Sequence, residues 1–237
     1  MSARDEILAR VRAAVADVTT EPGARGPVPV IEETSPGVSA TVELFAENVS
    51  DYRATVIRVR ASDGDGVDGV DGSDAVAEAV AAAVRTQGCR SVVVPTGLDP
   101  SWVQAIERVA EVRREVDATT HSELDAVDAV VTGSALGIAT TGTIVLDHGP
   151  DQGRRELTLV PDTHVCVISA GQIVHDVPEA VARLRPGRHG AAPLTWISGP
   201  SATSDIELQR VEGVHGPRTL VVILVGAPDV AGTEPLG

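Results

Sequence analysis

Apolar residues follow two different spacings along this chain. In three segments they recur every three or four positions, which places them on one face of a helix; these segments are residues 2–18, 42–52 and 74–87. Elsewhere they form short runs that are typical of strands. The runs cover residues 54–60, 91–94, 111–117, 129–132, 138–146, 157–160, 165–169, 194–198 and 219–225.

Prolines and capping residues mark further helices between these runs. Asp99 followed by Pro100 is an N-cap with proline in the first turn, so a helix begins there. Pro178 opens another helix that continues to Leu184. Strands that alternate with helices predict an α/β fold with a mainly parallel sheet flanked by helices.

A segment rich in proline and glycine, from Pro22 to Pro29, divides the chain near its beginning. We therefore expect two parts. Residues 1–35 would be an N-terminal helical arm with its linker, and residues 36–230 an α/β domain. The arm is the best candidate for a contact with a partner or with a second copy of the chain.

The charge of the chain excludes several partners. The formal net charge is −15 at pH 7, and so negative a surface repels nucleic acid and anionic membranes. No apolar run approaches the roughly 18 residues that cross a bilayer, and the charged N-terminus does not resemble a secretory signal. We expect a cytoplasmic protein without a membrane span and without a nucleic-acid partner.

Several kinds of cofactor chemistry need residues that the chain lacks. All 19 basic residues are arginine, so a Walker A lysine and a Schiff-base lysine are both missing. No G-x-G-x-x-G follows a predicted strand, so nothing indicates a dinucleotide site. The two cysteines, Cys89 and Cys166, cannot supply the four ligands of an iron–sulfur cluster, and we expect buried thiols.

An acidic, glycine-rich loop over residues 62–74 invites comparison with a calcium-binding loop. Counted from Asp63, the fifth, sixth and twelfth positions of an EF-hand loop would be Val67, Asp68 and Asp74, which do not fit. A solvated acidic loop is favoured instead. The six histidines show no ligand spacing either, so no metal site is expected.

Three polar clusters stand where apolar runs end: residues 137–143, 198–207 and 213–217. In open α/β sheets, ligands gather at the carboxyl ends of strands. In the second cluster, Ser204 and Glu207 have the spacing of a capping box, which predicts a helix whose free N–H groups suit an anion. Alternatively, the acidic residues there only satisfy the helix cap and dipole.

The other polar residues each leave two interpretations open. The threonines of residues 137–143 could hold a carboxylate or phosphate, or the glycines there only relieve crowding in a strand. Arg154 and Arg155 could clamp a carboxylate, or they lie exposed on the surface. Catalysis and simple turn stabilisation are both open for three histidines, namely His148, His164 and His215.

Taken in order, these motifs resemble those of the lactate-utilisation (LUD) domain family. They are A-T-T-G-T, G-R-R, L-V-P-x-T-H, I-S-G-P-S-A-T-S-D-I-E and G-V-H-G-P, within residues 127–225. The long G-P-S-A-T-S-D-I-E segment is the most specific of them. The resemblance implies a fold similar to the group that contains ribose-phosphate isomerase, glucosamine-phosphate deaminase and the CoA transferases.

The resemblance also implies a function. It suggests a non-redox subunit of a three-part system that oxidises L-lactate to pyruvate, so that lactate serves as a carbon source. Iron–sulfur clusters are then expected on the partner subunits, and no cofactor on this chain. Two alternatives remain: a free-standing enzyme of this fold that acts on an anionic small molecule, and a purely structural interaction subunit.

The motif positions give a candidate site for a small carboxylate or phosphate ligand. Glu207 and His215 are the candidate proton acceptors. Hydroxyls, backbone amides and guanidinium groups would hold the ligand. The candidate ligand-binding residues are Thr141, Gly142, Thr143, Arg154, Arg155, Gly199, Pro200, Ser201, Thr203 and Asp205.

Overall fold

A computed structural model describes residues 3–14, 16, 37–60, 72–117, 120–185, 193–201 and 216–226. Contacts between Cα atoms group the chain into two units, Met1–Thr34 and Ser35–Gly237. In the first unit α1 (Ala3–Ala14) is a helix, as its periodicity predicts. The predicted linker and residues 62–71 of the acidic loop lie outside the described residues. Within the described ranges, no helix is long and apolar enough to cross a membrane.

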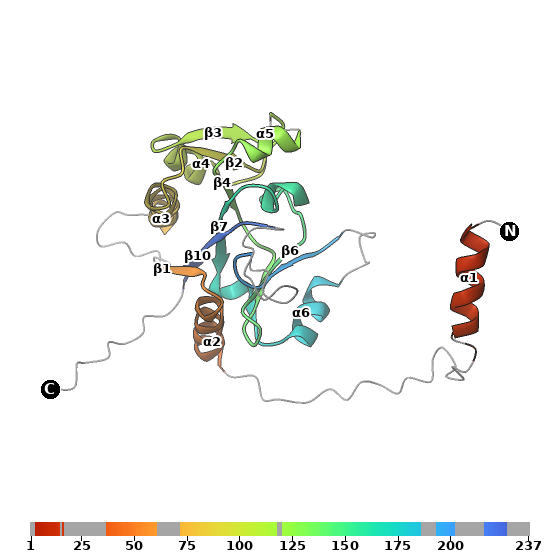
Figure 1. The fold of residues 1–237 in the computed structure, drawn as a ribbon. Coiled ribbons are helices and arrows are strands. Elements are labelled where there is room, and N and C mark those ends of the chain that lie inside the picture. The colour runs from red at the N-terminus through yellow and green to blue at the C-terminus, as the bar shows by residue number, and fades with distance from the viewer. Residues whose placement is uncertain are drawn as a thin grey trace. The chain divides into compact units, whose positions relative to one another are not determined.

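Six parallel strands form the main sheet of the second unit, in the order β1-β10-β7-β4-β2-β3 (Figure 1). The predicted α/β class with a mainly parallel sheet is therefore confirmed. The edge strand β1 pairs with β10, which lies far from it in the sequence. The strands are β1 (Thr55–Val59), β2 (Ser91–Val94), β3 (Glu111–Arg114), β4 (Ala129–Thr132), β7 (Thr163–Ser169) and β10 (Thr219–Val225).

Both faces of this sheet are covered, which explains why its central strands are apolar at nearly every position. Two helices, α3 (Gly72–Thr86) and α4 (Pro100–Glu107), cover one face, and Val165 of β7 packs in that cluster. The next residue, Cys166, packs in the cluster on the opposite face, with α2 (Val38–Asp51). Asp99 caps α4 as predicted, because its side chain accepts a hydrogen bond from the Ser101 amide.

A second, mixed sheet packs on the α2 side of the main sheet, with the strand order β8-β5-β6-β9. Ile144 and Leu146 of this sheet share the apolar cluster of α2. The predicted helix after Pro178 is α6 (Val177–Leu184), whose Ala180 is buried on the other side of the second sheet. The strands are β5 (Leu136–Ile138), β6 (Thr143–Leu146), β8 (Ile173–Val174) and β9 (Thr195–Ile197).

The single strand predicted over residues 138–146 is wrong. The chain reverses between β5 and β6, which pair antiparallel with Leu136 opposite Val145. Gly142 lies in the reversal with a φ of +55°, which side chains with a Cβ rarely allow. A Cβ at this position would lie 2.8 Å from the backbone carbonyl carbon of Asn48 in α2. Gly142 therefore permits both the turn and its close approach to the helix.

The strand predicted over residues 157–160 is also wrong. Arg155–Thr158 form a short 3₁₀ helix, η1, in which the Leu157 side chain is fully buried. The apolar residues of this segment correctly predicted that it is buried, but burial alone does not distinguish a strand from a helical turn. Further short elements were not predicted, namely α5 (His121–Asp125), η2 (Ala170–Gln172) and β8.

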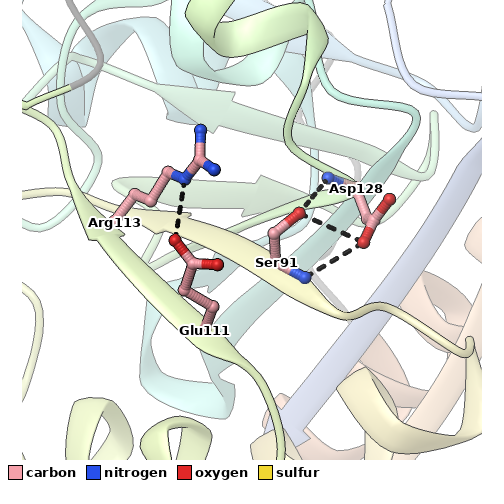
Figure 2. Close-up of polar contacts among 4 residues, drawn as sticks. All are labelled: Ser91, Glu111, Arg113 and Asp128. Carbon is pink, nitrogen blue, oxygen red and sulfur yellow. Dashed lines mark hydrogen bonds and ion pairs between the residues drawn. The ribbon is translucent and has the colours of Figure 1, made fainter.

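A reciprocal pair of hydrogen bonds ties the beginnings of β2 and β4 together (Figure 2). Asp128 Oδ2 accepts from the Ser91 amide at 3.0 Å and its hydroxyl at 3.1 Å, while Ser91 Oγ accepts from the Asp128 amide at 3.1 Å. Burial raises the pKa of Asp128, but these bonds and one from the Arg90 amide outweigh it, so the pKa lies below its ordinary value. On the edge strand β3, Figure 2 shows Arg113 beside Glu111.

Candidate functional site

A pocket of about 400 Å³ opens where β9 ends beside the amino ends of β7 and β10. Chain segments that are far apart in the sequence meet there, including parts of the second and third polar clusters. The lining consists of residues 194–201, Arg155, Thr158, Leu159, His164, Gly216, Pro217 and Leu220.

The pocket does not lie at the carboxyl ends of the strands, where the ligand site was expected. The rule on carboxyl ends concerns strands of a single parallel sheet, whereas β9 belongs to the second sheet and runs antiparallel to β6. The carboxyl edge of the main sheet holds a smaller pocket of about 190 Å³, lined by Gly133, Asp151 and Gln172 among others. The predicted ligand residues in the described ranges do not line that smaller pocket.

A chain of three hydroxyl groups joins the first polar cluster to the second. Thr143 Oγ1 lies 2.7 Å from Thr141 Oγ1 and 2.7 Å from Ser198 Oγ. The pairing of Ile144 with Ile197 sets this arrangement, because the next pair outward brings Thr143 beside Ser198. The structure thus joins Thr141 and Thr143, through Ser198, to the rim of the pocket.

Gly199 and Ser201 fix the turn that follows β9. Gly199 has a φ of +89°, and a Cβ there would lie 2.7 Å from the Tyr52 Cβ at the end of α2. The Ser201 amide donates a hydrogen bond of 2.8 Å to the Pro217 carbonyl, which draws the second and third clusters together. Gly199, Pro200 and Ser201 all line the pocket, so the structure brings these three predicted residues to one place.

The two neighbouring arginines do not act as a pair. Arg155, at the start of η1, lines the pocket with an exposed side chain. Arg154 does not line it; its amide donates to Glu115 Oε1 at 2.9 Å, and its Nε lies 3.9 Å from Glu156 Oε2. The structure therefore leaves only Arg155 of the predicted clamp at the pocket.

His164 is a buried residue that lines the pocket, and its imidazole is neutral because its surroundings are apolar. Its exposed fraction is 1%. Its Nε2 lies 2.8 Å from Thr132 Oγ1, whereas Nδ1 has no hydrogen-bond partner among the described residues. Burial lowers the pKa of His164 to about 4, so the ring is neutral at pH 7.

Charge in the pocket contrasts with charge on the whole chain. Among the described lining residues, Arg155 is the only one that is charged at pH 7, since His164 is neutral and none of the others is acidic. The remaining polar lining consists of hydroxyls, including Thr158, Ser198 and Ser201. A cation and hydroxyl donors in an otherwise apolar hollow suit a small anion.

His148 has a structural role in the loop after β6. Its Nδ1 lies 3.0 Å from the Gly153 carbonyl and donates to it, and its Nε2 lies 2.9 Å from Thr195 Oγ1. Both ring nitrogens are therefore occupied within the protein. The histidine fastens its own loop, at a φ of +61°, to the strand that leads to the pocket.

The described residues do not include every predicted site residue. Four of them lie outside the described ranges: Thr203, Asp205, Glu207 and His215. The helix predicted to begin near Ser204 lies there as well. The two cysteines are described, and both thiols are buried as expected. Burial raises the pKa of Cys166 to about 12, so this thiol stays protonated at pH 7.

The burial of His164 can be predicted from its neighbours in the sequence. An imidazole between Thr163 and Val165, inside an apolar strand, must be buried, and a buried ring needs partners for both nitrogens. Ser198 was recognised as part of a cluster but not as a site residue. Only the contact with Thr143 across the second sheet connects its hydroxyl to the site.

In the described part of the chain, no group of three or more acidic, histidine or cysteine side chains is arranged for a metal ion.

Comparison with protein families gives a match between residues 76–225 and the model of the LUD domain. Among curated sequences, the lactate utilization protein C of Deinococcus radiodurans is 42% identical over 94% of this chain and 96% of its own length. The protein of the same name from Bacillus subtilis is 34% identical over 40% of this chain and 41% of its own. An uncharacterised protein from Neisseria meningitidis is 30% identical over 60% of this chain and 64% of its own.

Among solved structures, the chain is similar to a DUF162 family protein from Deinococcus radiodurans. The TM-score is 0.62 and the sequence identity 36%, over 81% of this chain and 99% of the other. The similarity in fold thus covers nearly the whole of that crystal structure.

Proposed function

The chain belongs to the LUD domain family, as its motifs indicated, and we propose that it serves lactate utilisation as a non-redox subunit of a complex that oxidises L-lactate to pyruvate. One observation carries this proposal. The 42% identity to a protein named for lactate utilisation extends over 94% of the chain, so it includes the arm and the pocket as well as the family motifs.

The chemistry of the reaction supports a division of labour. Oxidation of L-lactate to pyruvate releases two electrons and two protons, and an enzyme normally needs a cofactor to accept the electrons. The chain has two cysteines, too few for a cluster that needs four thiolates. We therefore place the iron–sulfur clusters on partner subunits, which would receive the electrons, while this chain contributes to binding or proton transfer.

In this proposal the polar clusters form the part of the site that this chain supplies. The Gly199–Ser201 turn and Arg155 line the pocket, and the hydroxyls of Thr141 and Thr143 are connected to it through Ser198. Thr203 and Asp205 would extend this ligand-binding segment. Glu207 and His215 are proposed to accept protons during oxidation of the substrate.

Substitution of the proposed proton acceptors tests this function. Glu207→Gln and His215→Ala, each in the complete complex, should lower lactate-dependent dye reduction by about a hundredfold, because general base catalysis typically contributes that much. Partner binding should remain, as measured by co-purification, and Arg113→Ala on the edge strand β3 serves as the control. Unchanged lactate oxidation in both variants would show that the two roles are wrong.

A second candidate function is a free-standing enzyme that acts on an anionic small molecule. The Arg155 guanidinium and the hydroxyl-bearing residues of the pocket favour it, because they need no partner subunit to bind an anion. Thermal-shift measurements on the isolated chain distinguish the two functions. A stabilising shift with sugar phosphates or CoA esters, and none with lactate, would favour the free-standing enzyme.

A further inference from the structure

The tautomer of His164 follows from its neighbours at the wall of the pocket. The Thr132 hydroxyl has one proton and two acceptors in reach, namely His164 Nε2 at 2.8 Å and Cys166 Sγ at 3.9 Å. Nitrogen is the better acceptor and the nearer one, so the proton points to Nε2. The Cys166 thiol donates instead to the Gly133 carbonyl at 3.6 Å. A neutral ring that accepts at Nε2 carries its own proton on Nδ1.

This N–H group is a buried donor without an acceptor in the described residues. Such groups are uncommon in folded proteins, because a buried donor that loses water and gains no partner destabilises the fold. His164 lines a pocket of about 400 Å³, which offers the space for an acceptor from outside the chain. The ring is held in place by Thr132, whose side chain is fully buried, so the donor is preorganised.

Arg155, the cation in the pocket, also has no acidic partner within the described part of the chain. No hydrogen bond or ion pair to a carboxylate is made by the Arg155 guanidinium among the described residues, although the chain carries 34 acidic side chains. Its neighbour Arg154 does have Glu156 within 4 Å, at 3.9 Å. A guanidinium that stays unpaired on so acidic a protein keeps its charge for a ligand.

The charge balance selects the class of anion. One guanidinium matches a single negative charge, whereas the His164 ring supplies a neutral N–H and no charge. A dianionic phosphate would leave one charge uncompensated on a protein of net charge −15. A planar carboxylate also fits the forked geometry of a guanidinium.

We infer that this pocket binds a small monocarboxylate, whose oxygens accept hydrogen bonds from the Arg155 guanidinium and from the Nδ1–H of His164. Hydroxyls of Thr158, Ser198 and Ser201 line the same pocket and favour a polar substituent on the carbon chain. The site itself follows from these contacts. Only the identification of the carboxylate as lactate or pyruvate rests on the proposed function.

Binding to the isolated, full-length chain tests the inference. Calorimetric titrations at constant ionic strength would use sodium L-lactate, pyruvate, propionate and inorganic phosphate. The carboxylates should bind and phosphate should bind more weakly. Arg155→Ala should raise the Kd of the carboxylate by at least about tenfold, since one charge-assisted hydrogen bond is worth that factor. Arg113→Ala, which changes an arginine on the edge strand β3 outside the pocket lining, should alter the Kd less than twofold by the same arithmetic.

A second measurement reports on His164 without changing the fold. In the unmodified protein with ¹⁵N-labelled histidine, the Nδ1 resonance of His164 should shift and its proton exchange should slow as carboxylate is added. The absence of any carboxylate binding would overturn the inference and leave water as the acceptor. Tighter binding of phosphate would overturn the ligand class, and binding that survives Arg155→Ala without a change at His164 would overturn the site. None of these results depends on lactate oxidation by the complex.

Discussion

At the scale of single residues, His164 combines burial with a position at the pocket. The imidazole is almost fully buried, and its Nε2 lies 2.8 Å from Thr132 Oγ1. Cys166, two residues further along the same strand, is equally buried, and its thiol is satisfied by the Gly133 carbonyl. Buried polar groups in folded proteins nearly always have a hydrogen-bond partner, and in the inference above the partner of His164 Nδ1 is a carboxylate oxygen of the ligand.

The lowered pKa of His164 predicts how stability depends on pH. In the folded state the pKa is about 4, below its ordinary value of 6.5, so the unfolded chain binds a proton first on acidification. The neutral imidazole therefore makes its full contribution to the free energy of unfolding above pH 6.5. This contribution decreases as the pH falls from 6.5 to 4, by up to about 3 kcal/mol. Urea unfolding at several pH values would measure it.

The comparison needs a variant, because other groups also titrate in this range. In His164→Gln the free energy of unfolding should lack the pH dependence that this imidazole causes. The difference in the free energy of unfolding between the variant and the unmodified protein should therefore shrink on acidification. His121→Gln, at an exposed position, should leave the slope unchanged. A difference that is constant from pH 7 to pH 4 would contradict a buried neutral imidazole.

At the scale of elements, two glycines set the approach of turns to the end of α2. Gly142 in the β5–β6 reversal lies against Asn48, and Gly199 after β9 lies against Tyr52. Both have positive φ values and both flank the chain of hydroxyls that reaches Ser198. The helix end therefore serves as a common support for the two polar clusters.

A Cβ at Gly199 should disturb this support. Gly199→Ala combines a φ of +89° with a Cβ contact of 2.7 Å to Tyr52, and we expect it to lower the free energy of unfolding by about 1–3 kcal/mol. Gly171→Ala is the matched control, because the nearest atom to its Cβ would lie at 3.9 Å. Equal stability of the two variants in urea unfolding would contradict the assigned contact.

The elements also show what the sequence pattern can and cannot predict. The strand over residues 91–94 was predicted to the residue, because a short valine run between breakers has few other interpretations. The reversal at Gly142 was missed, since the run over residues 138–146 is apolar on both sides of the turn. Leu157 was placed in a strand for the same reason: an apolar side chain records burial and not backbone conformation.

At the scale of the whole molecule, the pocket depends on contacts that the sequence does not encode locally. The α/β class and the parallel sheet follow from alternation of segments, but the pairing of β1 with β10 joins distant parts of the chain. The clusters before β10 and after β9 were recognised separately. Their meeting at the amino ends of β7 and β10 required the second sheet, whose existence no local pattern indicated.

The central claim, a role as a subunit in lactate oxidation, is tested most directly by purification of the tagged chain under anaerobic conditions from lactate-grown cells of its own host. The account predicts co-purified, iron-containing partners and lactate-dependent dye reduction that is lost when this chain is removed. An iron-free preparation without partners, together with unimpaired lactate oxidation in cells that lack this chain, would contradict it.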